Sequence, residues 1–216
     1  MSRKQKLRKS KEKLIFIFSE WETEICYFNQ LKRFLKLPKL YILGNKWQIS
    51  WKNVDKIFEL KKSIYWVIEN NRSKYTKKNI KDTGSKIFYL LDIDWFNRNS
   101  YTQEEIDFIK NNFEDENIKV FFSNKDFELW ILLHLLDYRR EDWKYIEKIE
   151  KITQKEYKKW NCNIEFFGKI IENNLQDAID RWRKLEDYQI KSQWRSNLKN
   201  MNPFTEVYKI FNELEI

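Results

Sequence analysis

Three short, mostly apolar runs predict buried β-strands. They cover residues 14–18, 87–91 and 118–122, and polar residues follow each of them. Apolar runs of this length are typical of strands that are covered on both faces of a sheet. Two shorter pieces, 41–43 and 49–51, are further strand candidates.

Segments with apolar residues at helical spacing separate these strands. They cover residues 22–35, 54–68, 102–113 and 126–136. The third begins with Thr102 and Glu105, which match the S/T-x-x-E capping box of a helix start. The polar segment 70–85 resembles a loop. Alternating strands and helices predict an α/β fold with a mostly parallel sheet flanked by helices.

The last third of the chain has a helical pattern without a strong strand run. From about residue 141 apolar residues keep helical spacing, and Asn202-Pro203 is expected to start a final helix, with Asn202 as its cap. The predicted organisation is a basic N-terminal arm (1–13), an α/β core (14–140) and a helical C-terminal extension packed on it (141–216).

Positive charge is concentrated in two polar segments of the 216-residue chain. The formal net charge is +9, and residues 1–13 and 71–86 hold much of the excess of lysine and arginine. These segments are candidates for contact with nucleic-acid phosphates. The candidate side chains are Lys74, Lys77 and Lys78, with Lys125 after the third strand. The alternative is that lysine is simply abundant in this sequence.

Several site classes are disfavoured. The three glycines lie too far apart for a glycine-rich nucleotide loop. Two isolated cysteines, Cys26 and Cys162, and a single histidine argue against a Cys/His zinc site and against a disulfide framework. His134 lies in an apolar stretch, where a hydrogen-bonded core residue is expected. No run suits a membrane span, so a cytoplasmic protein is expected.

Acidic residues follow two of the predicted strands. Glu20, with Glu22 and Glu24, follows the first, and Asp92 with Asp94 follows the second. Ligands of open parallel sheets bind at the carboxyl ends of the strands, and Mg²⁺ or Mn²⁺ prefers such oxygen ligands. Two structural alternatives stay open, because acids in a first helical turn complement the helix dipole and an Asp after a strand is often a turn residue.

The acidic segments belong to a series of motifs that resembles the RloB-like family. The matching segments are 19–24 with 27–28, 92–94, 123–134, 157–159 and 202–205. The resemblance implies a Toprim-like domain in which Glu20, Asp92 and Asp94 bind Mg²⁺. It also implies a nuclease acting on RNA, including tRNA, or on DNA, in an anti-phage defence system of restriction-linked or abortive-infection loci. An AAA-type or ABC-type ATPase partner is expected.

Supporting roles follow from this reading. Glu24 is a candidate for proton transfer, and Lys158 or Lys159 for stabilising charge on the phosphate, although the lysines also fit a solvated helix face. Glu128 is expected to support the site or to cap its own helix. The alternative function is a non-catalytic module that binds nucleic acid or docks on an ATPase. An exposed helical tail is compatible with a homodimer.

Overall fold

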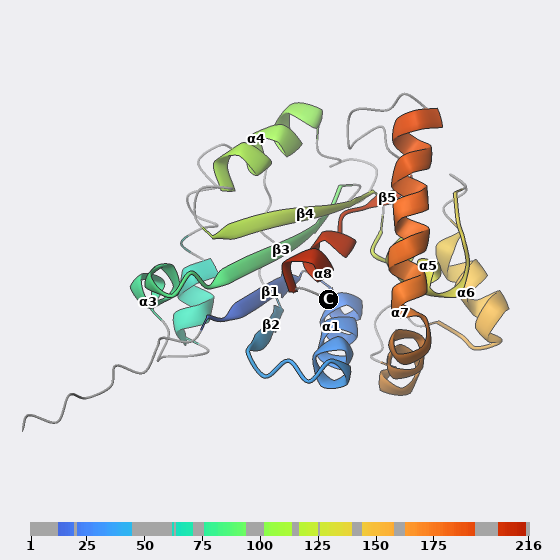
Figure 1. The fold of residues 1–216 in the computed structure, drawn as a ribbon, viewed down its shortest axis with the longest axis horizontal. Coiled ribbons are helices and arrows are strands. Elements are labelled where there is room, and N and C mark those ends of the chain that lie inside the picture. Colours follow the sequence, from blue (N-terminus) through green and yellow to red (C-terminus); the bar gives the residue numbers. More distant parts are fainter. Residues whose placement is uncertain are drawn as a thin grey trace, which may run out of the picture.

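The computed structural model describes most of the chain between residues 13 and 214. The described residues are 13–19, 21–44, 62, 64–70, 76–93, 102–113, 117–124, 126–139, 144–157, 163–192 and 203–214. They form an α/β fold around a five-stranded, mostly parallel sheet (Figure 1). The basic arm predicted at the N-terminus lies almost wholly outside this part of the chain.

The sheet has the strand order β2-β1-β3-β4-β5. The strands are β1 (Ile15–Ser19), β2 (Leu40–Gly44), β3 (Lys86–Asp92), β4 (Ile118–Asn124) and β5 (Phe204–Thr205). The first four are parallel, and β5 pairs antiparallel with the end of β4 through residues 123 and 124. The parallel strands place their carboxyl ends at one edge of the sheet.

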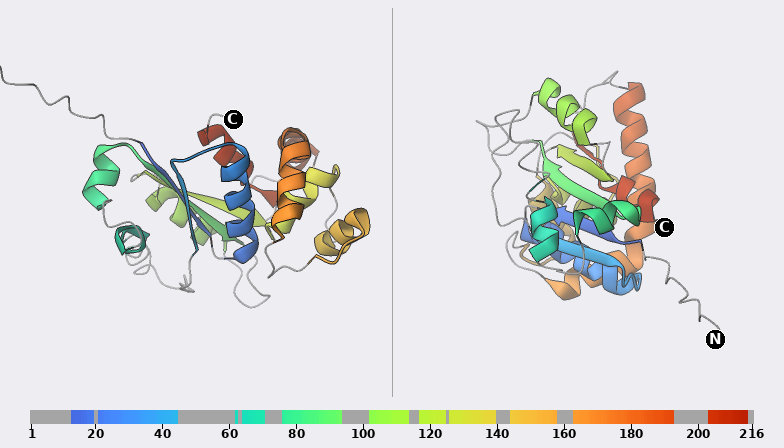
Figure 2. Two further views of the ribbon diagram at one scale, coloured as in Figure 1. Left: turned by 90° about the horizontal axis from the view of Figure 1, so that it is seen from below. Right: turned by 90° about the vertical axis from the view of Figure 1, so that its left-hand side faces the viewer.

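Helices cover both faces of the sheet. The first face packs on α1 (Glu22–Phe34), α5 (Glu128–Leu135), α6 (Tyr145–Thr153), α7 (Ile164–Asp187) and α8 (Tyr208–Leu214). The second packs on helical residues 64–70, α3 (Lys77–Asp82) and α4 (Gln103–Phe113). Figure 2 shows α7 and α8 on one side of the strands. The strands therefore bury both faces, which explains their nearly continuous apolar runs.

The long helix α7 ties the C-terminal segment to the core. Asn163 caps it by accepting a hydrogen bond from the backbone N–H of Phe166, and its apolar face packs on α1 and α5. The helix continues into a π-helical turn, η2 (Tyr188–Ser192), where the buried Gln189 side chain donates to the carbonyl of Pro203 at 3.1 Å. This contact connects the end of the helix to the start of β5.

Most of the predicted elements are confirmed. The strand runs correspond to β1, β3 and β4, and the weak piece 41–43 lies in β2. Helix predictions at 22–35, 102–113 and 126–136 correspond to α1, α4 and α5. The capping box is present, since Glu105 accepts from Thr102 N at 2.7 Å and Thr102 Oγ1 accepts from Glu105 N. The candidate strand 49–51 and most of the helix 54–68 lie outside the described residues.

Two predictions of secondary structure are wrong. The polar segment 70–85 contains the short helix α3, whose single buried apolar residue, Ile80, packs on the sheet. Pro203 precedes strand β5 and not a helix, and α8 begins five residues later at Tyr208. A two-residue strand carries no periodicity of its own, so only its pairing with β4 identifies it.

Cys26 in α1 forms a disulfide bond, against the expectation of a chain without disulfides. Cys162, the other cysteine of the sequence, lies outside the described residues. An isolated cysteine outside any short cysteine motif gives no sequence signal of a disulfide. None of the helices in the described ranges is both long enough and apolar enough to cross a membrane.

Candidate active site

Three polar side chains extend from strand ends onto the face of the sheet that α1 covers. Ser19 ends β1, Asp92 ends β3 and Ser123 lies near the end of β4. Each lies two positions after an apolar residue of the core on the α1 face, so strand alternation directs it to the same face. All three are buried, and Asp92 keeps 8% of its surface exposed. A carboxylate therefore lies among hydroxyl groups at the carboxyl end of the sheet.

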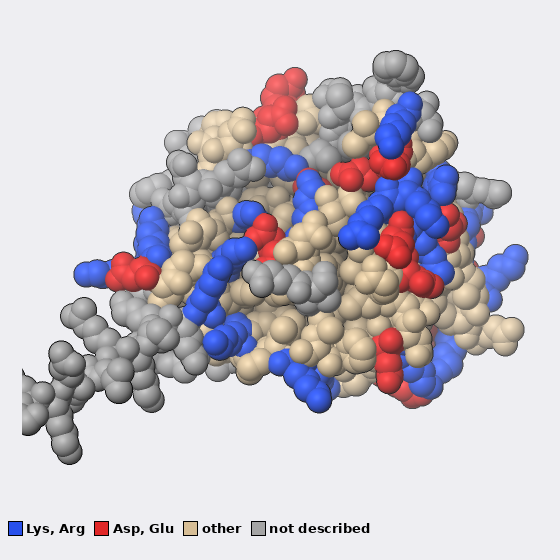
Figure 3. Space-filling view, in the orientation of Figure 1, with Lys and Arg blue, Asp and Glu red and all other residues tan. Residues whose placement is uncertain are grey.

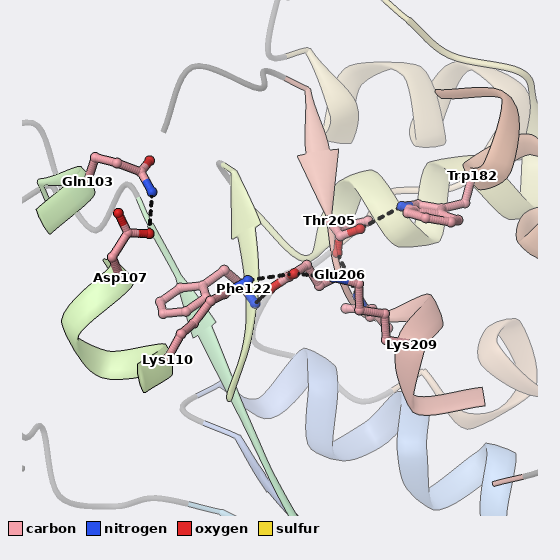
Figure 4. Close-up of polar contacts among 9 residues, drawn as sticks. Gln103, Asp107, Lys110, Phe122, Trp182, Thr205, Glu206 and Lys209 are labelled. Atoms are coloured by element: carbon pink, nitrogen blue, oxygen red, sulfur yellow. Dashed lines mark hydrogen bonds and ion pairs between the residues drawn. The ribbon is translucent and has the colours of Figure 1, made fainter. Parts of the chain in front are cut away.

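Asp92, Ser123 and Thr205 lie on the neighbouring strands β3, β4 and β5, and we call these three side chains the polar row. Asp92 is the register partner of Ser123, and Ser123 Oγ lies 2.9 Å from Thr205 Oγ1. Trp182 Nε1 in α7 donates to the Thr205 carbonyl at 2.6 Å (Figure 4). Thr205 is fully buried, so these hydrogen bonds hold β5 and the C-terminal segment against the strand that neighbours Asp92.

Glu24 holds the turn that follows β1. Its Oε2 accepts hydrogen bonds from the hydroxyl of Ser19 and, at 3.1 Å, from the backbone N–H of Trp21. The side chain of Glu24 is 2% exposed, whereas that of Glu22 in the same helical turn points to solvent. These two donors flank Glu20, which itself lies outside the described residues. Glu24 thus fixes the backbone on both sides of a predicted metal ligand.

A second buried carboxylate, Glu128, lies in the first turn of α5. It is 1% exposed and accepts a long hydrogen bond, 3.4 Å, from the hydroxyl of Tyr157. Burial raises the pKa of Tyr157, and the nearby Glu128 carboxylate raises it further, while a hydrogen bond with Thr23 opposes the rise. Tyr157 therefore stays protonated and connects α5 to the start of α1.

A family model for RloB-like proteins matches residues 15–214. The chain belongs to the RloB-like family. No curated protein and no solved structure matches it. The matched residues include all the motif segments on which the resemblance rests, from the turn after β1 to the segment that contains β5.

The RloB-like fold places three of the predicted site residues in polar positions near strand ends or helix starts. Asp92, Glu24 and Glu128 are all buried, and each extends from a different element. Of the predicted metal ligands, Glu20 and Asp94 lie outside the described residues. Within the described ranges no group of three or more His, Cys, Asp or Glu side chains could hold a metal.

Asp92 fits a hard divalent cation by its chemistry. A carboxylate at a strand end supplies the oxygen ligand that Mg²⁺ or Mn²⁺ prefers, and its neighbours in the polar row are hydroxyl groups. Glu20 follows β1 directly in the sequence, and β1 is hydrogen-bonded to β3. The order of the strands therefore favours a shared site for Glu20 and Asp92.

The predicted nucleic-acid contacts at Lys77 and Lys78 lie away from Asp92. Both side chains are exposed on α3, which precedes β3 and lies at its amino end, whereas Asp92 ends the strand (Figure 1). A seven-residue strand spans about 20 Å. The Nζ of Lys77 also lies 4.9 Å from the ring centre of Tyr65. Lys74, Lys125, Lys158 and Lys159 lie outside the described residues.

His134 is the hydrogen-bonded core residue that the sequence predicts. Its Nδ1 lies 3.0 Å from the Trp130 carbonyl, which can only accept, so Nδ1 carries the proton. Nε2 then accepts from the hydroxyl of Tyr27 at 3.1 Å. Burial lowers the pKa of His134 to about 4, against the opposing effect of the Trp130 hydrogen bond. The imidazole is neutral and connects α1 with α5.

Sequence reasoning missed the hydroxyl residues of the candidate site. Ser19, Thr23, Ser123, Thr205 and Tyr157 all fall inside the motif segments but were not singled out as site residues. Their common signal is a polar residue in or beside an apolar run, which alone does not tell a buried hydroxyl from a turn residue. The contacts of Ser123 with Thr205 and of Tyr157 with Glu128 join segments that are far apart in the sequence, whereas Ser19 contacts the turn that follows it.

Proposed function

We propose that this RloB-like chain is a divalent-metal-dependent nuclease of Toprim type, acting as the effector of an anti-phage defence system. The observation that carries the proposal is the position of Asp92. It lies buried at the carboxyl end of β3, beside the strand that leads into Glu20. Membership of the RloB-like family supports the same reading. The substrate class is RNA, including tRNA, or DNA.

In the proposed site, Glu20, Asp92 and Asp94 would hold Mg²⁺ or Mn²⁺. The bound cation would activate water and neutralise charge on the scissile phosphate. Of these ligands, Asp92 is held at the carboxyl end of β3. Glu24 serves as a positioning residue, because its Oε2 bonds to both neighbours of Glu20.

Proton transfer falls to carboxylates in this proposal. The only histidine of the chain, His134, is committed to two buried hydrogen bonds and is a weak base there. Glu24 already accepts two hydrogen bonds on Oε2, which favours Glu20, Asp92 or Asp94 as the proton acceptor. Lys158 or Lys159 would stabilise the developing charge on the phosphate.

Glu128, which lies in α5, and Tyr157, which follows α6, support the site. Tyr157 keeps its proton and donates it in a hydrogen bond to Glu128, so the pair joins the start of α5 to the segment that leads to Lys158. The proposal includes an AAA-type or ABC-type ATPase as partner, a cytoplasmic location and a homodimer as an assembly to be tested.

The proposal is tested by induced expression of the wild type and of Asp92→Asn in a bacterial host, with and without a co-expressed ATPase. We expect growth arrest and discrete tRNA, other RNA or DNA fragments only with the wild type. A matched control is Asp82→Asn, which removes an exposed carboxylate from α3 and should behave as the wild type. Intact nucleic acid in every strain would favour the non-catalytic binding module.

A further inference from the structure

A cavity of about 530 Å³ lies along the outer edge of β4, between the two helical layers. Its lining includes three lysines and two glutamates from β4, α4 and the segment 206–213. The charged lining residues are Lys110, Lys119, Glu206, Lys209 and Glu213. Figure 3 shows lysine and arginine side chains spread over the face of the molecule where α8 lies, with acidic side chains among them.

Glu206 binds two of the lysines that line the cavity and the backbone of β4. It is 1% exposed, and its Oε2 accepts from the backbone N–H of Phe122 at 3.1 Å. Its Oε1 binds Lys110 Nζ from α4, at 2.7 Å, and Lys209 Nζ from α8 (Figure 4). One buried carboxylate therefore holds two ammonium groups from opposite sides of the sheet.

Glu213 repeats the arrangement further along the strand edge. Its two carboxylate oxygens bind Lys86 Nζ and Lys119 Nζ. Burial alone would raise the pKa of Glu213, but the two lysines hold it below its ordinary value. We call the two arrangements the Glu206 clamp (Glu206, Lys110, Lys209) and the Glu213 clamp (Glu213, Lys86, Lys119).

Each clamp carries more positive charge than its carboxylate neutralises. Within each clamp one lysine balances the glutamate and the second adds one positive charge, while the nearby Glu186 carboxylate also acts on Lys209 of the Glu206 clamp. The ammonium groups remain 26% to 48% exposed as side chains, and each has further N–H groups beyond the one that binds the glutamate. The clamps therefore offer fixed, partly solvated donors to an additional anion.

The spacing of the clamps suits an extended polyanion. Glu206 contacts β4 at Phe122 and Glu213 contacts it at Lys119, and these positions are about 10 Å apart along the strand. Glu206 directly follows Thr205, the last residue of the polar row that begins at Asp92. A chain of phosphates on the clamps would thus lead toward the carboxyl end of the sheet.

We propose that the cavity along β4 binds the sugar–phosphate backbone of a nucleic-acid strand through the two lysine clamps. This deepens the proposed function, since it assigns the substrate contact of the same protein. It assigns Lys110, Lys119 and Lys209 of the cavity lining as the backbone contacts, in place of Lys77 and Lys78.

The test measures binding without cleavage. Fluorescence anisotropy follows short labelled single-stranded RNA and DNA with the full chain in EDTA, over a range of salt concentrations. The clamp variant Lys119→Gln/Lys209→Gln removes one lysine from each clamp, so each carboxylate keeps one cation. The control Lys77→Gln/Lys78→Gln removes the same charge from α3. Thermal unfolding checks that both variants fold.

We expect the clamp variant to bind about tenfold more weakly. The slope of the logarithm of the binding constant against the logarithm of the salt concentration should become shallower by about 0.7 for each lysine removed. The α3 control should bind within about twofold of the wild type. If the clamp variant does not fold, the single variant Lys119→Gln takes its place. The variant Lys119→Arg/Lys209→Arg keeps both positive charges and should bind as the wild type does.

Three results would overturn this assignment: a wild type that does not bind, equal weakening in both double variants, or full displacement by a mononucleotide at the same phosphate concentration. A chain that binds through the clamps but never cleaves would instead count against the nuclease proposal alone.

Discussion

At the scale of single residues, the two glutamates in the first turn of α1 have opposite environments. Glu24 is buried and binds Ser19 and Trp21, whereas Glu22 is exposed. The sequence indicated acids after the first strand, but their spacing could not tell which carboxylate turns inward. That choice depends on the hydroxyl and the N–H that the turn presents.

We expect Glu24→Ala to lower the free energy of unfolding by about 1–3 kcal/mol, because two donors in the turn lose their acceptor. Glu22→Ala should cost less than about 1 kcal/mol, since it removes only a favourable charge near the helix start. Urea unfolding of both variants measures the difference. Equal losses would show that the hydrogen bonds of Glu24 do not hold the turn.

At the scale of elements, the sequence predicted the long pieces and missed the short ones. Apolar runs and helical spacing reveal β1, β3, β4 and α1, because their own residues carry the pattern. Strand β5 has two residues and depends on pairing with β4, and α3 has one buried apolar residue. The Glu206 clamp was equally invisible, since it joins α4, β4 and α8.

The contact between α1 and α5 predicts a pH-dependent stability. His134 has a pKa of about 4 in the folded chain, below the ordinary value of 6.5, so protonation favours the unfolded chain. Its contribution is fully present above pH 6.5 and is lost as the pH falls from 6.5 toward 4. We expect a loss of about 2 kcal/mol between about pH 7.5 and about pH 5.

Urea unfolding across this range measures that loss. His134 is the only histidine of the chain, so His134→Gln should remove most of the slope. Stability that is independent of pH in the wild type would mean that the imidazole stays solvated and is not held between Tyr27 and Trp130.

At the scale of the whole molecule, the parallel sheet brings the motif segments together. Asp92, Ser123 and Thr205 lie on three neighbouring strands, although more than a hundred residues separate the first from the last. The α/β pattern predicted that strand ends would share one edge. It could not predict the hydroxyl row or the antiparallel strand that completes it, because these depend on the C-terminal segment returning to the sheet.

We propose that this edge of the sheet binds a divalent cation through Asp92. Electron paramagnetic resonance of Mn²⁺ measures it directly, because the signal of free Mn²⁺ falls as the ion binds the purified chain. We predict binding by the wild type and by Asp82→Asn, and a loss of about tenfold or more in affinity for Asp92→Asn with unchanged thermal unfolding. Equal Mn²⁺ binding by the wild type and Asp92→Asn, or none by either, would contradict a metal site at Asp92.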